Sequence, residues 1–249
     1  MLIDVHSHLD FPQFDNDREY VIERASKEDI IIINSGLGPE GIERTLSLSE
    51  RYENVLATLG LSPQEFDGNV ICEVINLIRR YRDEIVGIGE VGLDYYWVRD
   101  GEKRKLEMEN FEKFMDLSIE LNLPLVIHSR DAENDVIEKL IEYDMGALLH
   151  CFSGNLRQAE KAISIGCLIS IPTSVVYSKQ KQKLVREIPL ENIVLESDAP
   201  YLSPVPRTRN EPINIKMSLK KISEIKNIDI EEIAEVTTKN AMSFFNLQF

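Results

Sequence analysis

Short apolar runs alternate with amphipathic stretches along the whole chain, and this alternation constrains the fold more than any other feature. Eight runs have the length and β-branched content of buried strands: Leu2–His8, Ile30–Ser35, Val55–Leu61, Ile85–Val91, Pro124–His128, Gly146–Cys151, Gly166–Ile171 and Ile193–Asp198. Helical patterns lie between them, at Asp17–Lys27, Pro39–Tyr52, Val70–Tyr81, Glu102–Leu121, Ala132–Tyr143, Leu156–Ile165 and Ser178–Glu187. Eight strand–helix units with short connections predict an α/β fold, the (β/α)8 TIM barrel.

The rest of the chain fits the same architecture. An open doubly wound sheet is the alternative, but no Gly-x-Gly-x-x-Gly sequence follows the first run. A Pro-rich loop, Pro200–Pro212, leads to a helix over Ile213–Ile225, and an additional C-terminal helix has Asp229 as N-cap with Glu232 at capping-box spacing. We expect the last helix to pack on the barrel exterior through Ile230, Ile233, Ala234, Ala241 and Phe244. No linker interrupts residues 1–249, which predicts a single domain.

The charge and cysteine content limit the partners of the chain. With 43 acidic and 28 basic residues, the net charge is −15, so we expect no extended basic face for nucleic acid. A bound metal ion can still supply positive charge to a phosphate ester. Three cysteines without a Cys-x-x-Cys pair favour a reduced protein. Because the first run begins at residue 2 and no run could span a bilayer, we expect a cytoplasmic protein without a signal peptide or membrane association.

The chain has only four histidines, and each one ends an apolar run: His6 and His8, His128, and His150. Side chains alternate along a strand, so His6 and His8 are expected to share one face with Asp4, and Val5 to face the other way. A pair of hydrogen-bonded structural histidines is the alternative interpretation. Because the C-terminal ends of barrel strands surround the active site, four imidazoles at such ends favour a metal site.

Two of the apolar strands end in carboxylates. Alternation places Glu90 on one face with Ile88, and Asp198 on one face with Glu196. A carboxylate at the end of an apolar strand is costly unless it is paired or metal-bound. A buried ion pair with an arginine such as Arg130 is the alternative.

These donors exceed what one ion can use. Four imidazoles and two carboxylates are more than the four ligands of a tetrahedral zinc and suit two divalent ions, with the carboxylate of the fourth strand as a bridge. Mixed nitrogen and oxygen ligands admit Mg²⁺, Mn²⁺, Zn²⁺ or Co²⁺.

The chain resembles the TatD-type metal-dependent deoxyribonuclease family, within the amidohydrolase-like (β/α)8 superfamily. The resemblance runs along nearly the whole chain. It is carried by the segments Asp4–Asp10, Gly89–Tyr95, Leu125–Arg130, His150–Gly154, Leu195–Leu202 and Arg209–Pro212.

The resemblance implies a ligand set. One metal would be held by His6, His8, Glu90 and Asp198, and a second by Glu90, His128 and His150. The chain departs from the family pattern at Gly60-Leu61-Ser62-Pro63, where family members usually carry Gly-x-His-Pro. Ser62 therefore replaces an imidazole near the substrate, which puts the substrate contacts of the family in doubt but not metal binding.

The expected activity is hydrolysis of DNA phosphodiester bonds. A metal-bound hydroxide would attack phosphorus, Asp198 would take the proton from the bridging water, and Glu196 would support the site. The acidic composition favours strand ends or short oligonucleotides, and hence exonuclease action. A hydrolase of a small ester, amide or lactone is the second hypothesis, and a non-catalytic binding barrel the third, because one fold hosts many functions.

Side chains near the strand ends are candidates for substrate contacts. Arg130 could clamp a phosphate or pair with an acid, and Arg207 and Arg209 could meet phosphates or be solvated or paired. Tyr95, with the two aromatic residues that follow it, could stack on a base or pack on the rim. Cys151 is expected to be a core residue rather than a nucleophile. Three lysines are expected to form a solvated helix face: Lys179, Lys181 and Lys183.

Overall fold

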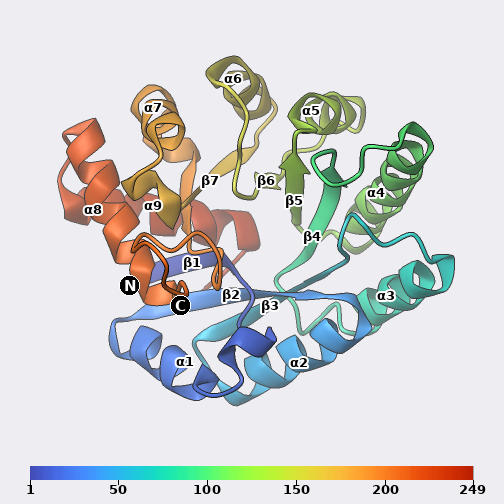
Figure 1. Ribbon diagram of the computed structural model, residues 1–249, viewed down its shortest axis with the longest axis horizontal. Helices are drawn as coiled ribbons and strands as arrows, with labels where there is room; N and C mark the ends of the chain where they lie inside the picture. Colours follow the sequence, from blue (N-terminus) through green and yellow to red (C-terminus); the bar gives the residue numbers. More distant parts are fainter. Residues whose placement is uncertain (249) are drawn as a thin grey trace.

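Eight parallel strands follow one another around a barrel in chain order. The computed structural model describes residues 1–248 and confirms the predicted (β/α)8 fold (Figure 1). Each strand pairs with the next. The strands are β1 (Leu2–Ser7), β2 (Ile30–Leu37), β3 (Val55–Gly60), β4 (Gly87–Asp94), β5 (Leu125–Arg130), β6 (Leu148–Leu149), β7 (Leu168–Pro172) and β8 (Ile193–Glu196).

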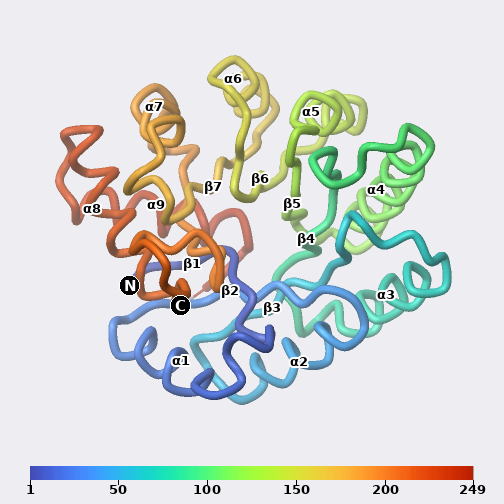
Figure 2. Tube along the Cα trace, viewed as in Figure 1, coloured from blue at the N-terminus to red at the C-terminus, as the bar shows by residue number. Residues whose placement is uncertain are grey.

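Helices α1 to α8 surround the strands, as the continuous trace in Figure 2 shows from blue to red, and one further helix follows them. They are α1 (Arg18–Lys27), α2 (Gly38–Arg51), α3 (Gly68–Arg80), α4 (Gly101–Leu121), α5 (Glu133–Glu142), α6 (Leu156–Ser164), α7 (Lys179–Glu187), α8 (Ile215–Lys226) and α9 (Ile230–Phe245). Short 3-10 turns are η1 (Pro12–Phe14), η2 (Thr173–Val176), η3 (Leu190–Asn192) and η4 (Pro212–Asn214). Within residues 1–248, no helix combines the length and apolar content needed to cross a bilayer.

Polar side chains fix where several helices begin. Asp67 and Asp100 accept hydrogen bonds from backbone N–H groups in the first turns of α3 and α4, which satisfies donors that a helix start leaves free. Asp229 caps α9 as predicted, but its carboxylate accepts from the N–H of Glu231 at 3.0 Å rather than from that of Glu232.

Hydrogen bonds connect β1 and the residue that follows it to the segment directly after β8. The Asp198 N–H donates to the His6 carbonyl at 3.0 Å, and the His8 N–H donates to the Ala199 carbonyl at 2.7 Å. The buried Asp4 carboxylate accepts from both the backbone N–H and the hydroxyl of Ser197, at 2.7 and 2.6 Å. These bonds hold the first and last strands together beside the histidines of β1.

Helix α9 closes the N-terminal end of the barrel. Ala241 and Phe245 belong to the apolar cluster inside the barrel, with the strand residues Ile3, Val5, Ile33, Val126, Leu148 and Val194. The Thr238 hydroxyl donates to the Met1 carbonyl, directly before β1. The prediction that this whole helix packs on the exterior is therefore wrong for its second half, including Phe244, whereas Ile233 does pack in the outer cluster.

Strict side-chain alternation fails in two strands. The register of β1 shifts between Asp4 and Ser7, and that of β4 between Ile88 and Val91. As a result Val5 lies in the interior cluster although the neighbouring His6 also faces inward, toward Glu90. Ile88 packs in the outer cluster although Glu90 lines the cavity. The predicted sharing of faces was wrong here, because a register shift reverses which residues face inward.

Candidate metal centre

A cavity of about 680 Å³ lies at the C-terminal end of the barrel, where the chemistry of this fold is found. Its wall contains five of the predicted metal-site residues, namely His8, Glu90, His128, His150 and Asp198. The wall also contains Phe11, Asp94, Trp97, Arg130, Lys181 and Tyr201.

Glu90 lies between two pairs of histidines. Its Oε2 atom is 3.4 Å from Nε2 of His6 and 3.5 Å from Nε2 of His8. Its Oε1 atom is 2.6 Å from Nδ1 of His128 and 3.8 Å from Nε2 of His150. Each oxygen of one carboxylate therefore faces a different pair of imidazoles.

Two groups of donor atoms have the spacing of metal ligands. His6, Glu90 and His150 form one group, and His6, His8 and Asp198 form the other, with all atoms of a group within 4.8 Å of one another. The Nε2 atoms of His6 and His8 are only 3.1 Å apart. His128 lies outside both groups. Its Nδ1 lies 2.6 Å from Oε1 of Glu90 and its Nε2 lies 3.0 Å from Oδ2 of Asp94.

Hydrogen bonds orient two of the imidazoles. Nδ1 of His8 lies 3.0 Å from the Ser35 carbonyl, and Nδ1 of His150 lies 2.9 Å from Oε2 of Glu196. Both partners can only accept, so each Nδ1 carries the proton and Nε2 is the ring nitrogen directed at the site. Metal-bound histidines are held in the same way. The donor set and its orientation therefore fit divalent cations.

Buried carboxylates dominate the electrostatics of the cavity. Burial opposes charge on His8 and His128, but Glu90 with Asp198 raises the pKa of His8 to about 9, and Asp94 with Glu90 raises that of His128 to about 10. Burial and the neighbouring His150 lower the pKa of His6 to about 3. Because imidazole ligates only when neutral, a bound cation would replace the protons that this negative field attracts.

The carboxylates themselves differ in environment. Burial favours the protonated form of Glu90, but His150 and His128 outweigh it and hold the pKa of Glu90 well below its usual range. Burial raises the pKa of Asp198 to about 6, and the nearby Glu196 adds to the shift. Glu196 keeps a lowered pKa despite its burial, because of His150. The strand predicted to reach Asp198 ends at Glu196, and Asp198 has a left-handed backbone with φ +55°.

Asp94 was not assigned a role from the sequence. It is buried, and its Oδ2 lies 3.0 Å from Nε2 of His128. The signal was present, because Asp94 follows Glu90 by four residues in the same strand and β4 pairs with β5, which carries His128.

The predicted contacts Tyr95 and Arg130 lie beside each other at the ends of β4 and β5, where the Tyr95 N–H donates to the Arg130 carbonyl. Arg130 makes no ion pair with the described residues, and its guanidinium lies 3.7 Å from the ring centroid of Tyr96. The Tyr95 hydroxyl donates to Asp135 at 2.7 Å, and Tyr95 is not part of the cavity wall. Trp97, two residues on, does line the cavity and is 63% exposed.

Three other substrate candidates lie away from the cavity wall. The Ser62 hydroxyl accepts from the N–H of Gln64 at 3.3 Å in the turn after β3. Arg207 is exposed in the loop after β8. Of the roles predicted for Arg209, the structure shows the ion pair with a carboxylate. Its guanidinium donates to both oxygens of Asp17 at 2.7 Å and so connects the loop after β8 to the start of α1.

The predicted lysine face is wrong at one position. Lys179 and Lys183 are exposed on α7, but Lys181 is buried, 6% exposed, and lines the cavity. Its ammonium group donates to the carbonyls of Cys151 and Phe152. Burial raises the pKa of the Cys151 thiol, which agrees with the prediction that it is not a nucleophile.

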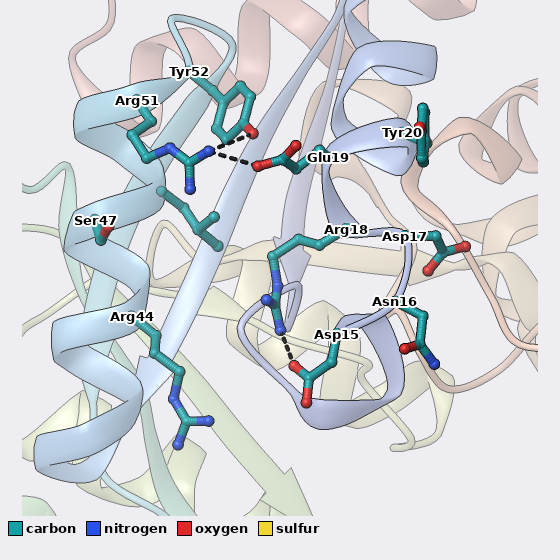
Figure 3. A pocket seen from close by; sticks show the side chains of 11 residues that line it. Asp15, Asn16, Asp17, Arg18, Glu19, Tyr20, Arg44, Ser47, Arg51 and Tyr52 are labelled. Atoms are coloured by element: carbon teal, nitrogen blue, oxygen red, sulfur yellow. Dashed lines mark hydrogen bonds and ion pairs between the residues drawn. The ribbon is translucent and has the colours of Figure 1, made fainter.

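A second hollow, of about 310 Å³, lies on the outer surface between α1 and α2 (Figure 3). Arg18 pairs with Asp15 at 2.6 Å and Arg51 pairs with Glu19 at 2.6 Å, as the dashed lines show. Arg44, which also lines the hollow, pairs with Glu40 outside it. Since each arginine already has an acidic partner, this hollow offers no free positive charge to a phosphate.

Comparison with known proteins places the chain in a family. The family described as TatD related DNase matches residues 3–246. The chain belongs to the TatD-related DNase family. An uncharacterized metal-dependent hydrolase of Methanocaldococcus jannaschii is 40% identical over 98% of this chain and 96% of its own length. Human deoxyribonuclease TATDN3 is 38% identical over 98% of this chain and 94% of its own.

A solved structure agrees with the assignment. The TatD homologue YJJV from Escherichia coli superposes with a TM-score of 0.91, covering 99% of this chain and 98% of its own, at 27% identity. The TatD-family chain is therefore a metal-dependent hydrolase acting on ester bonds, and its expected fold and family are confirmed.

Proposed function

We propose that this TatD-family hydrolase cleaves DNA phosphodiester bonds with two divalent metal ions. The observation that carries the proposal is the position of Glu90. Its two oxygens face two pairs of imidazoles, His6 with His8 and His128 with His150, which is the arrangement that a carboxylate shared by two ions needs.

We propose the two ligand sets that the family resemblance implies, and the position of Glu90 between the histidines supports them. His6, His8, Glu90 and Asp198 would hold one ion, and Glu90, His128 and His150 the other. The bound ions would supply Lewis acidity toward the phosphate and lower the pKa of water, whether they are Mg²⁺, Mn²⁺, Zn²⁺ or Co²⁺.

The residues of the chain supply orientation and proton transfer. Asp198 lies in the cavity with Oδ1 4.0 Å from Nε2 of His8, where its carboxylate can take a proton from the attacking water. Glu196 holds the ring of His150 through Nδ1, and Asp94 acts in the same way on His128.

The surroundings favour short or terminal DNA substrates. The net charge of −15 opposes the long-range attraction that extended duplex binding uses. The cavity volume lies in the range of sites for small ligands. We therefore propose that the enzyme acts on strand ends or short oligonucleotides and is exonucleolytic.

The activity test compares substrate classes. Metal-loaded protein is incubated with single- and double-stranded oligonucleotides labelled at the 5′ or the 3′ end, beside a panel of esters and lactones. We expect a ladder that shortens from one end. Hydrolysis of the esters or lactones with every oligonucleotide left intact would overturn the proposal in favour of a small-molecule hydrolase.

The metal count tests the site directly. Elemental analysis of protein refolded with Mn²⁺ or Zn²⁺ should give up to two ions per chain, and His6→Ala and His128→Ala should each lower that number. Ser62→Ala is the control, because its hydroxyl faces the turn after β3. An unchanged count in both histidine variants would contradict the ligand sets.

A further inference from the structure

Lys181 is a buried cation in the cavity wall that the proposed mechanism does not use. It stands in the first turn of α7, is 6% exposed, and lines the cavity with His150 and Asp198. The two neighbouring lysines of α7, Lys179 and Lys183, are exposed. The burial is therefore specific to this position and is not a property of the helix.

The ammonium group of Lys181 is only partly satisfied by the chain. It carries three N–H donors, and two carbonyls accept from it, those of Cys151 and Phe152. Among residues 1–248 these carbonyls are its hydrogen-bond partners, and its charge acts on the carboxyl group of Glu133 without forming an ion pair. A buried ammonium without a paired carboxylate is costly, so a ligand in the cavity that brings its own anionic group could pair with it.

The neighbourhood of Lys181 suits an anion. Ser153 and Ser174, which follow β6 and β7, also line the cavity. The arginine in the wall, Arg130, is exposed and lies against the ring of Tyr96. Of the lysine and the arginine in the cavity wall, Lys181 is therefore the buried one, and it lines the cavity together with His150.

We propose that the Lys181 ammonium group binds a non-bridging phosphate oxygen of the substrate, on the β6–β7 side of the cavity. A hydrogen bond between an ammonium group and a phosphate oxygen is charge-assisted and is stronger than one between neutral groups. The inference rests on the proposed phosphodiesterase function for its substrate. It adds a contact that would orient the phosphate beside the metal ligands.

A purely structural role is the competing explanation. Lys181 holds the carbonyls of the segment directly after His150, so its loss could displace that histidine. The two roles differ in their effect on metal content, because a displaced His150 would weaken metal binding while a lost phosphate contact would not.

The test measures binding of inorganic phosphate to metal-loaded protein by titration calorimetry. Lys181→Met should weaken phosphate binding tenfold or more and keep the metal content of the wild type. Lys181→Arg, which keeps the charge, should stay within a few-fold of the wild type. Lys183→Met, the same change at an exposed position of α7, should have no effect. On an oligonucleotide, Lys181→Met should raise KM more than it lowers kcat.

Other outcomes overturn the inference. Unchanged phosphate binding in Lys181→Met, or loss of a metal ion from it, would show that the residue does not act on the anion. If this variant does not fold, Lys181→Gln decides, because its amide can still donate to the two carbonyls without a charge. If the wild type cleaves no oligonucleotide but Lys181→Met still binds inorganic phosphate more weakly than the wild type, only the proposed function fails.

Discussion

The two ends of the barrel are built from the same strands and have opposite chemistry. At the N-terminal end the interior is aliphatic, and Phe245 and Ala241 of α9 seal it. At the C-terminal end the interior holds imidazoles and carboxylates around a cavity. The change occurs within two residues in β5, from Val126 to His128, and within two residues at the end of β6, from Leu148 to His150.

The difference separates stability from chemistry along each strand. Burying apolar surface at the closed end stabilises the barrel. Holding several buried carboxylates close together at the open end costs free energy unless cations neutralise them. Substitutions at the open end should therefore lower activity, and substitutions at the closed end should lower stability.

The largest effect is expected at the open end. Asp198→Asn keeps the size and a coordinating oxygen, but the amide cannot take a proton at neutral pH. We expect kcat to fall about 10³-fold or more while the fold is retained. Steady-state kinetics at saturating metal, with the circular dichroism spectrum as a check, measures this.

The matched control for this change is Glu196→Gln. Its side chain bonds to His150 rather than lining the cavity, so a milder loss of kcat is expected. If Asp198→Asn kept more than a tenth of the wild-type kcat with chemistry rate-limiting, another group would be the base.

A stability effect is expected at the closed end. Phe245 is 3% exposed in the interior cluster, so Phe245→Ala should lower the free energy of unfolding by about 3 kcal/mol or more. Activity per folded molecule should not change. Urea unfolding measures the first quantity, and the half-buried Phe244→Ala should cost less. A large loss of kcat in folded Phe245→Ala would break the separation of the two ends.

A smaller, pH-dependent effect is expected beneath the open end. Glu107 of α4 is 1% exposed, one of its oxygens accepts from the Asp94 N–H, and burial raises its pKa from 4.5 to about 7. The unfolded chain releases this proton first as pH rises, so stability falls between pH 4.5 and 7. Glu107→Gln should remove this loss. The unfolding free energy of the variant, relative to that of the wild type, should be about 1–2 kcal/mol higher at pH 8 than at pH 5.

Denaturant titrations of both proteins at the two pH values decide the matter. A gain that is equal at pH 5 and pH 8 would show that Glu107 does not titrate in this range.

The sequence predicted the fold and the mouth residues for physical reasons that can be stated. Apolar periodicity marks elements, and the chemistry of a barrel lies at strand ends, so His128 and His150 could be placed without coordinates. Strand alternation was a less reliable guide to which residues face inward, because the residue types around Val5 and Ile88 give no indication of a register shift.

Properties that depend on contacts between distant segments were missed. Lys181 looks like its exposed neighbours, and only the carbonyls of Cys151 and Phe152, on another loop, account for its burial. Similarly, Tyr95 stands in a motif of the family, but its direction is set by Asp135, forty residues away.

The hydrogen bonds between His6 and Asp198 and between Asp4 and Ser197 have a consequence for biosynthesis. They bring residues from the first strand beside residues made almost two hundred positions later. Contacts so far apart in sequence form late, because the intervening chain must first be ordered. Until the segment that follows β8 has emerged from the ribosome, a nascent chain therefore lacks the Asp198 carboxylate of the centre. It also lacks the hydrogen bonds that join the first and last strands of the barrel. The hydrolase cannot acquire its complete site before the chain has been synthesised beyond Asp198.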